Sequence, residues 1–211
     1  MKHCITDIQV QKKHPSRRSI FLDGEFYCGV AADTAARFSL RPGMEIDENE
    51  LKDMLHEEDF SEAKNYVYRI LARRMYTNKE IRDKLSERGY TAEIIQDVIA
   101  AMERYGYLND KTFAEEWIRS RMQTKPKGKI ALRQELARKG IERSIIEDAL
   151  SRIFGDSKEL DTALDLARRR VKSYSKDEPE TARRKLWSFL LRRGFDFETV
   201  KDVVERVVGD M

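Results

Sequence analysis

A short pattern that occurs three times constrains the fold of this chain more than any other feature. In each copy two apolar residues stand four positions apart. After the second of them come two further residues, then a basic residue, and then a glycine, which is Gly89, Gly140 or Gly194. Apolar residues at this spacing share one face of a helix, and a glycine after the last turn readily adopts the left-handed conformation that ends it. The pattern predicts three amphipathic helices of similar design.

Each glycine is followed by a second repeated pattern, in which apolar residues recur at i, i+3, i+4 and i+7. The aligned stripes are Ile95, Val98, Ile99 and Met102, then Ile146, Ala149, Leu150 and Ile153, then Val200, Val203, Val204 and Val207. An apolar helix also precedes each pattern, around Val67, Ala114 and Ala167. Each copy is therefore predicted to be a unit of three short helices.

The first part of the chain differs from these repeats. Ile5, Ile8 and Val10 lie in a β-favouring stretch, and the runs 19–22 and 25–30 flank Asp23-Gly24, which is a strong hairpin signal. We expect a short helix near 31–38, a turn at 41–43 and a brief strand at 44–46. Asp47, and Asp59 or Ser61, are candidate helix N-caps.

The predicted fold class is mainly α, with three tandem three-helix repeats that form a curved, elongated array after a small β-rich N-terminal module. Small helical units bury little surface alone, so we expect neighbours to stack and share cores. The expected boundaries are residues 1–46 for the module, 47–60 for a connecting helix, 61–110 for repeat 1, 111–156 for repeat 2 and 157–211 for repeat 3.

Positive charge is concentrated in the repeats, although the whole chain carries only +3. Residues 1–60 hold eight Lys and Arg against twelve Asp and Glu, a net charge of −4, which leaves +7 for the remainder. The densest stretch, 117–143, has nine basic residues and two acidic ones. Such an excess is typical of a phosphate-binding surface, and an ordinary solvated helical face is the alternative.

The candidate residues for binding a partner or DNA are the basic side chains of the second and third repeats. In repeat 2 they are Arg119, Arg121, Lys125, Lys127, Lys129, Arg133 and Lys139, with the first three lysines expected in a loop. In repeat 3 they are Arg168, Arg169, Arg170, Lys172, Arg183, Arg184, Lys185, Arg192 and Arg193.

The sequence holds no arrangement typical of catalysis, of a metal site or of a cofactor site, and we expect no cofactor. The three histidines precede the repeats, and Cys4 and Cys28 are too few for a disulfide framework. A helix-turn-helix at 77–98 is the alternative for DNA binding, but its second helix offers only Gln96 to read bases. No apolar run is long enough to span a membrane, so we expect a cytoplasmic protein.

Repeat 2 carries a recognisable motif: Tyr105-Gly106-Tyr107-Leu108-Asn109-Asp110, then Phe113-Ala114 and Trp117, and later Leu136 and Gly140. In these residues the chain resembles the RecX regulatory proteins of bacteria, with Asn109 where an aspartate is usual. Both residue types are good helix N-caps, so the difference matters little. We expect the motif to be mainly structural, with Tyr107, Leu108, Phe113, Ala114 and Trp117 in the core.

The resemblance implies a regulator of RecA, the recombinase that polymerises on single-stranded DNA. Members of this family bind RecA and the RecA–DNA filament and inhibit its ATPase and recombinase activities, which affects homologous recombination, DNA repair and the SOS response. We expect a monomer that catalyses no reaction, binds DNA weakly and has no contact with membranes. A helical repeat protein that binds nucleic acid without RecA, or a scaffold that binds only protein, remains an alternative.

Overall fold

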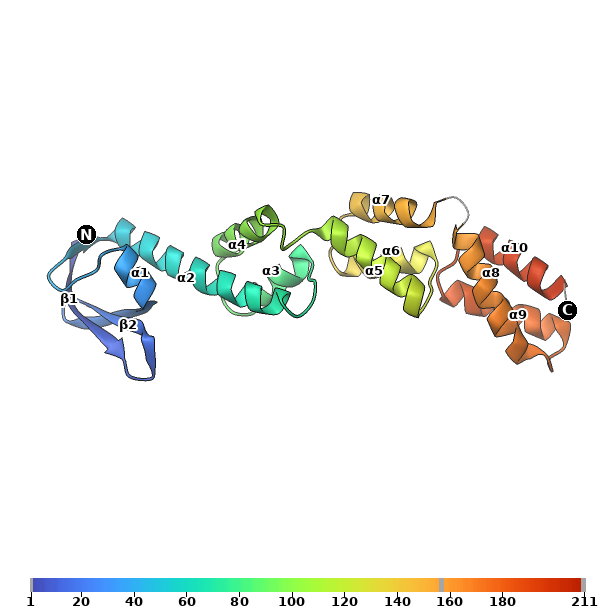
Figure 1. Ribbon diagram of the computed structural model, residues 1–211, viewed down its shortest axis with the longest axis horizontal. Coiled ribbons are helices and arrows are strands. Elements are labelled where there is room, and N and C mark those ends of the chain that lie inside the picture. Colours follow the sequence, from blue (N-terminus) through green and yellow to red (C-terminus); the bar gives the residue numbers. More distant parts are fainter. Residues whose placement is uncertain (1, 156–157, 210–211) are drawn as a thin grey trace. The chain divides into compact units, whose positions relative to one another are not determined.

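The computed structural model describes residues 2–155 and 158–209 of the chain. Within them lie four strands, ten α-helices and one 3-10 helix (Figure 1). Their order is β1 (Lys2–Gln11), β2 (His14–Leu22), β3 (Glu25–Ala31), α1 (Ala32–Arg37), β4 (Glu45–Asp47), α2 (Glu48–Leu71), α3 (Asn78–Ser86), α4 (Ala92–Arg104), α5 (Asp110–Thr124), α6 (Lys129–Arg138), α7 (Arg143–Phe154), α8 (Lys158–Val171), η1 (Lys172–Tyr174), α9 (Pro179–Arg192) and α10 (Phe197–Gly209). The chain divides into two compact units: Met1–Arg74 with Arg82–Tyr105, and Met75–Ile81 with Gly106–Met211.

The N-terminal module is a four-stranded antiparallel sheet in the order β3-β2-β1-β4. The predicted hairpin at Asp23-Gly24 is confirmed, because both residues have positive φ angles, 51° and 94°, between β2 and β3. Alternate residues of the strands, such as Ile5 and Ile20, are fully buried with Met54 of α2. The module thus shares its core with the helix that follows it.

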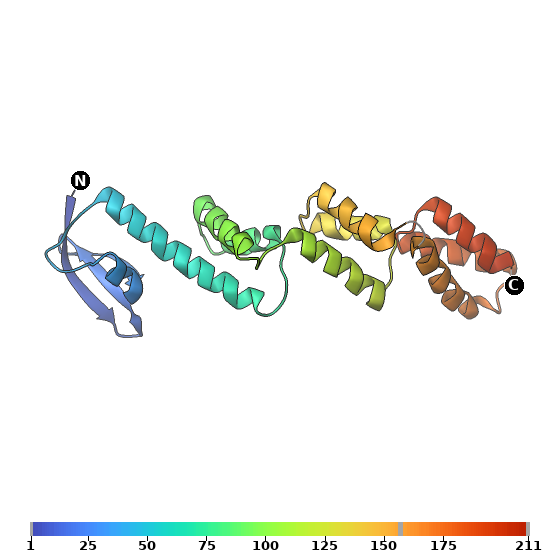
Figure 2. The ribbon, with the colours of Figure 1, turned by 45° about the horizontal axis from the view of Figure 1, so that its top comes forward.

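Helix α2 is a single helix of 24 residues, visible in Figure 2 as the longest helical ribbon. Asp47 caps it by accepting hydrogen bonds from the backbone of Asn49 and Glu50, while the Glu50 side chain accepts one from the Asp47 backbone. The prediction of a second N-cap at Asp59 or Ser61 is wrong. No glycine or proline interrupts this stretch, so the helix continues through both positions.

A buried carboxylate fixes α2 to the N-terminal module. Glu58 is only 5% exposed, and its two oxygens accept hydrogen bonds from the Ala31 backbone at 2.8 Å and from the Thr34 hydroxyl at 2.5 Å. Arg17 lies 3.4 Å from the same side chain. Glu58 of α2 thus accepts hydrogen bonds from both ends of the first turn of α1.

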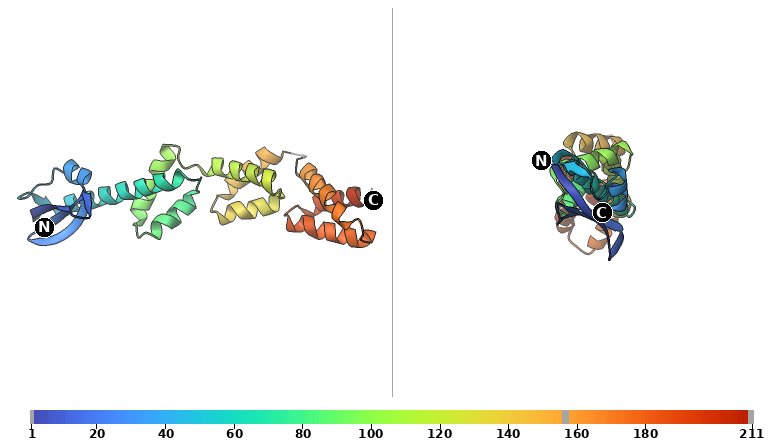
Figure 3. Two further views of the ribbon diagram at one scale, coloured as in Figure 1. Left: turned by 60° about the horizontal axis from the view of Figure 1, so that its bottom comes forward. Right: turned by 90° about the vertical axis from the view of Figure 1, so that its left-hand side faces the viewer.

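The three repeated glycines end their helices as predicted, with φ angles of +85° at Gly89, +81° at Gly140 and +83° at Gly194. The predicted stripes lie in α4, α7 and α10, and eleven of their twelve residues are buried, with Ile153 partly buried. Figure 3 shows α8, α9 and α10 as one bundle. The mainly α fold with a β-rich N-terminal module is therefore confirmed.

Repeats 2 and 3 each close a core of their own. Phe113, Ile118, Leu132 and others form one buried cluster, while Leu186, Phe195 and the valines of α10 form another. The expectation that neighbouring repeats share a core is wrong for this pair. The third helix of each repeat packs back on the first helix and covers its apolar face, so the repeats meet through other contacts.

These two repeats meet where the start of α6 lies against the turn after α9. The amide of Gly128 donates to the carbonyl oxygen of Arg193 at 3.0 Å, and the amide of Ile130 donates to that of Gly194 at 3.1 Å. A Cβ on Gly194 would lie 2.3 Å from the Cβ of Ala131. Glycine is therefore required at 194 both for its backbone angle and for the close approach.

The start of α3 meets the turn after α6 in the same way within the second unit. The Thr77 hydroxyl donates to the carbonyl oxygen of Lys139 at 2.8 Å, and a Cβ on Gly140 would lie 2.5 Å from the Cβ of Lys79. At both places, the first turn of the second helix of one repeat contacts the glycine turn that follows the second helix of the next repeat. We call these two contacts the glycine joints.

We predict that Gly194→Ala destabilises the protein more than Gly89→Ala. Both positions have the same backbone conformation, which costs alanine about 1 to 2 kcal/mol. A Cβ at Gly89 meets no described atom within 4 Å, whereas at Gly194 the overpacked joint should add about 1 to 3 kcal/mol. Urea unfolding followed by circular dichroism measures both. Equal losses would contradict the close contact at Gly194.

Candidate partner and nucleic-acid interface

The motif of repeat 2 builds the start of α5. The Asn109 side chain caps this helix by accepting a hydrogen bond from the backbone of Thr112 at 3.0 Å. Leu108, Phe113 and Ala114 are buried, and the half-buried ring of Trp117 stacks on Phe113 with 5.8 Å between centroids. These residues of the motif therefore lie in the core or cap the helix.

Tyr107 is the exception among the five motif residues that we expected in the core. It is 57% exposed, so its predicted place in the core is wrong. It lies in the turn before the cap of α5, outside the periodic face of any helix, and follows Gly106, whose φ is +75°. Tyr105, on the other side of that glycine, is 56% exposed.

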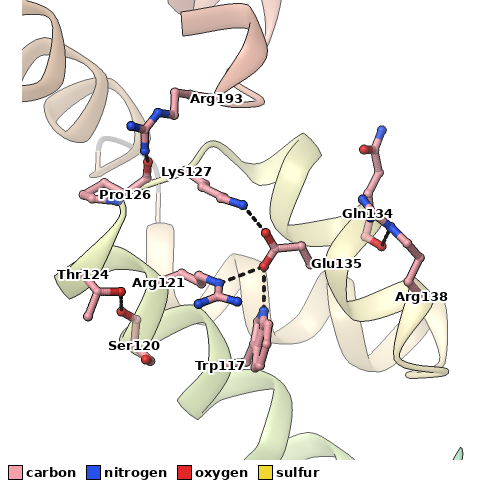
Figure 4. Close-up of polar contacts among 10 residues, drawn as sticks. All are labelled: Trp117, Ser120, Arg121, Thr124, Pro126, Lys127, Gln134, Glu135, Arg138 and Arg193. Atoms are coloured by element: carbon pink, nitrogen blue, oxygen red, sulfur yellow. Dashed lines mark hydrogen bonds and ion pairs between the residues drawn. The ribbon is translucent and has the colours of Figure 1, made fainter. Parts of the chain in front are cut away.

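The carboxylate of Glu135 on α6 binds three side chains at once (Figure 4). Its Oε2 accepts hydrogen bonds from Trp117 Nε1 at 2.9 Å and from Arg121 Nε at 3.0 Å, and its Oε1 accepts one from Lys127. The Glu135 side chain is 14% exposed. It therefore connects three elements at one point: α5, α6 and the loop between them.

These contacts set the ionisation of Glu135. Partial burial alone would raise its pKa, but the hydrogen bonds from Lys127, Arg121 and Trp117 outweigh it and lower the pKa below the usual 4.5. The charged form is therefore favoured in the folded chain.

Two cations also lie over the Trp117 ring. The guanidinium of Arg121 is 4.2 Å from the ring centroid, and Nζ of Lys139 is 4.4 Å from it. Lys139 further pairs with Glu80 at 2.8 Å, across one of the glycine joints. Basic residues of repeat 2 thus hold its aromatic core and its neighbour in place.

The other basic candidates of repeat 2 are mostly paired as well. Arg119 binds Glu115 and Glu116, Arg133 binds Glu147 at 2.5 Å, and Lys129 lies 3.3 Å from Glu159 of repeat 3. Lys129 is the first residue of α6 and not part of the loop, contrary to prediction. Six of the seven candidates therefore have a carboxylate partner, and Lys125 has none among the described residues.

Repeat 3 has the opposite arrangement. Its nine candidates lie on α8, η1, α9 and the turn after α9, and all but Arg193 are exposed. In the part of the chain that the structure describes, Lys185 alone among them has an ion-pair partner, Asp177 at 2.8 Å. Arg193 instead donates to the carbonyl oxygen of Pro126 at 3.4 Å (Figure 4). Among the sixteen candidates, those without an ion-pair partner in the described residues thus lie mainly in repeat 3.

Sequence reasoning missed the ion pairs that Glu135 and Glu159 form with the basic candidates. These two carboxylates neutralise Lys127 and Lys129, and their partners lie up to 30 residues away, as for Lys129 and Glu159. Glu135 stands out in the sequence as a carboxylate within a basic and apolar stretch, whereas Glu159 lies among other acidic residues and gives no such signal. Proximity in space, and not local charge density, identifies the paired lysines.

Other kinds of site receive no support from the described residues. No group of three or more His, Cys, Asp or Glu side chains is placed there to hold a metal ion. Burial raises the pKa of the Cys28 thiol to about 11, which disfavours its reactive thiolate. None of the described helices has an apolar stretch long enough to cross a membrane.

The fold and its charged surface define a class: tandem three-helix repeat proteins with a β-rich N-terminal module and a basic C-terminal repeat. Family models place the chain within that class. The RecX N-terminal domain matches residues 3–47, and the first, second and third RecX three-helix domains match 63–101, 109–150 and 157–204. The chain belongs to the RecX family.

Relatives match it over nearly its whole length. Regulatory protein RecX of Clostridium perfringens (strain 13 / Type A) is 31% identical over 98% of this chain and 97% of its own. That of Bacillus velezensis is 34% identical over 96% and 76%. A crystal structure of regulatory protein RecX, 26% identical, covers 99% of this chain and 100% of its own with a TM-score of 0.73, and RecX from Lactobacillus salivarius, 28% identical, covers 72% and 97% with a TM-score of 0.67.

We predict that Glu135 stabilises the fold most at neutral pH. Because its pKa is lowered in the folded state, its contribution is complete above pH 4.5 and is lost as the pH falls through the folded pKa. Glu135→Gln should cost about 2 kcal/mol at pH 7, and the difference from wild type should shrink in acid. Urea unfolding at several pH values, read by Trp117 fluorescence in a Trp187→Phe background, measures it.

Glu147→Gln is the matched control. Its partner Arg133 also lowers the pKa of Glu147, but both side chains are about 40% exposed, so the loss at pH 7 should be below about 1 kcal/mol. A Glu135→Gln loss no larger than this, or one independent of pH, would show that Glu135 does not stabilise this repeat as described.

Proposed function

We propose that this chain binds RecA and its nucleoprotein filament and inhibits the ATPase and recombinase activities, without catalysing a reaction itself. Membership of the RecX family along nearly the whole chain is the observation that carries the proposal. Its relatives are named regulatory proteins. A partner assembled on DNA implies a cytoplasmic role in recombination and DNA repair, including the SOS response.

The charge distribution supports a polyanionic partner. The exposed arginines of α8 and α9 have no carboxylate partner among the described residues, so no internal ion pair must break when they approach phosphates. A RecA filament carries a continuous DNA backbone, and neutralising its phosphates releases counterions. We therefore propose repeat 3 as the part of the chain that reaches DNA.

The same cations favour a second candidate function, in which the chain binds nucleic acid and acts without RecA. Phosphate contacts alone carry no sequence information and no preference for a filament. The two functions differ in a measurable way, because binding that requires RecA must be tighter to filament than to bare strand.

We predict that the chain inhibits the single-strand-dependent ATPase of RecA, with the inhibition set by the ratio of chain to RecA. Titration into RecA filaments on a long single strand, followed by ATP hydrolysis, measures this. Raising the concentration of free strand should not relieve the inhibition if RecA is the target. No inhibition when the chain saturates the filament would contradict the proposal.

Affinity provides the companion measurement. Anisotropy of the labelled chain should show binding to the filament at least about tenfold tighter than to bare strand, equivalent to about 1.4 kcal/mol. Equal affinities, together with relief of inhibition by excess strand, would support the nucleic-acid-binding alternative instead.

A further inference from the structure

Repeat 3 contains a basic pocket of about 270 Å³ on the outer face of α9. Its lining consists of Tyr174 from η1 and four residues of α9: Arg184, Lys185, Ser188 and Arg192. All five residues belong to one repeat of the second unit, so the pocket is complete within a single folded bundle. We call it the α9 pocket.

The periodicity of α9 explains why these side chains converge. Arg184, Ser188 and Arg192 are spaced at i, i+4 and i+8, which places them in one stripe roughly 12 Å long. The buried residues of the same helix, such as Leu186 and Leu190, lie on the opposite face against α8 and α10. The stripe can therefore face solvent without disturbing the core.

Tyr174 forms the wall of the pocket. Its hydroxyl accepts a hydrogen bond from Arg170 Nε at 2.9 Å, and Nζ of Lys185 lies 5.6 Å from its ring centroid. Lys185 also pairs with Asp177 at 2.8 Å, which fixes the ammonium beside the ring. The side chains of Tyr174 and Lys185 are thus held in position at this edge of the pocket before any ligand binds.

The charge of the α9 pocket is not balanced from within. Neither Arg184 nor Arg192 has an ion-pair partner in residues 2–155 and 158–209, and no carboxylate is among the lining residues. The two guanidinium groups, the ammonium of Lys185 with its partner Asp177, and the hydroxyls of Tyr174 and Ser188 therefore border a concave space that no carboxylate lines. Guanidinium groups bind phosphate oxygens in bidentate fashion, and a serine hydroxyl can donate a further hydrogen bond.

We propose that the α9 pocket binds the phosphodiester backbone of a nucleic-acid strand, with Arg184 and Arg192 on different phosphates and Ser188 between them. This proposal deepens the proposed function by naming the surface of repeat 3 that meets DNA. Two guanidiniums two helical turns apart fit a polyanion whose charges repeat along a line better than a single compact anion. An acidic protein segment and a lone phosphate are outcomes that the test separates.

The test compares two double variants of the full chain that lose the same charge. Arg184→Gln/Arg192→Gln removes the pocket cations, whereas Arg138→Gln/Arg143→Gln removes two exposed arginines of repeat 2 that also lack ion-pair partners among the described residues. Binding to a labelled 20-nucleotide oligothymidylate, without RecA, is measured by anisotropy over a range of salt. All four positions are exposed, so circular dichroism should show unchanged folding.

The pocket variant should bind about tenfold more weakly at 0.1 M salt, and its salt slope should fall by about 1.4, because each single-strand phosphate contact adds about 0.7. The control variant should keep most of the affinity. Equal losses in the two variants, or no loss in the pocket variant, would overturn the assignment. So would full competition by millimolar inorganic phosphate, or by polyglutamate as effectively as by unlabelled strand.

The pocket and the proposed function can fail separately. Inhibition of RecA by wild type, with oligothymidylate binding indifferent to Arg184 and Arg192, would overturn the pocket alone. Pocket-dependent binding to oligothymidylate without any inhibition of RecA would overturn the regulatory function and leave the pocket supported.

Discussion

The glycine joints bring two basic residues of repeat 2 to carboxylates of the neighbouring repeats. At each joint the absence of a Cβ lets the first turn of a neighbouring helix lie against a left-handed glycine, as Ala131 does at Gly194. That approach brings Lys139 to Glu80 across one joint. At the other joint, Lys129 of α6 lies beside Glu159 of α8. Repeat architecture and charge pairing are thus parts of the same contact.

The pairing changes how the basic sequence of repeat 2 should be interpreted. This stretch has the densest positive charge along the chain, but Glu135 binds two of its cations and Trp117 lies under two. Removing such cations would disturb a half-buried network as well as any binding surface. In repeat 3 the exposed arginines of α8 and α9 have no carboxylate partner among the described residues, and they are therefore more available to a ligand.

Local sequence patterns were enough to predict the repeated helices and the hairpin. The glycines, the apolar stripes and Asp23-Gly24 act over a few residues, so their helix ends and hairpin follow from backbone preference. The continuity of α2 was missed because good capping residues such as Asp59 also occur inside helices. The exposure of Tyr107 was missed because an apolar residue beside a helix was assigned to its buried face.

The candidate interface was less predictable, since it depends on partners that are distant in the sequence. Charge density identified the basic residues. It could not distinguish Lys139, which pairs with Glu80 at a distance of 59 positions in the sequence, from Arg184, which has no ion-pair partner among the described residues. Only the folded arrangement separates cations that stabilise the repeats from cations that can meet a ligand. That separation is the central claim of this account.

Photo-cross-linking within the bound complex tests that claim most directly. RecA filaments are assembled on a strand that contains 4-thiothymidine, the chain is added, and the cross-linked peptides are identified by mass spectrometry. We expect the cross-links to fall in η1 and α9, between Lys172 and Arg192. Cross-links confined to α5 and α6 of repeat 2, with none in repeat 3, would contradict it.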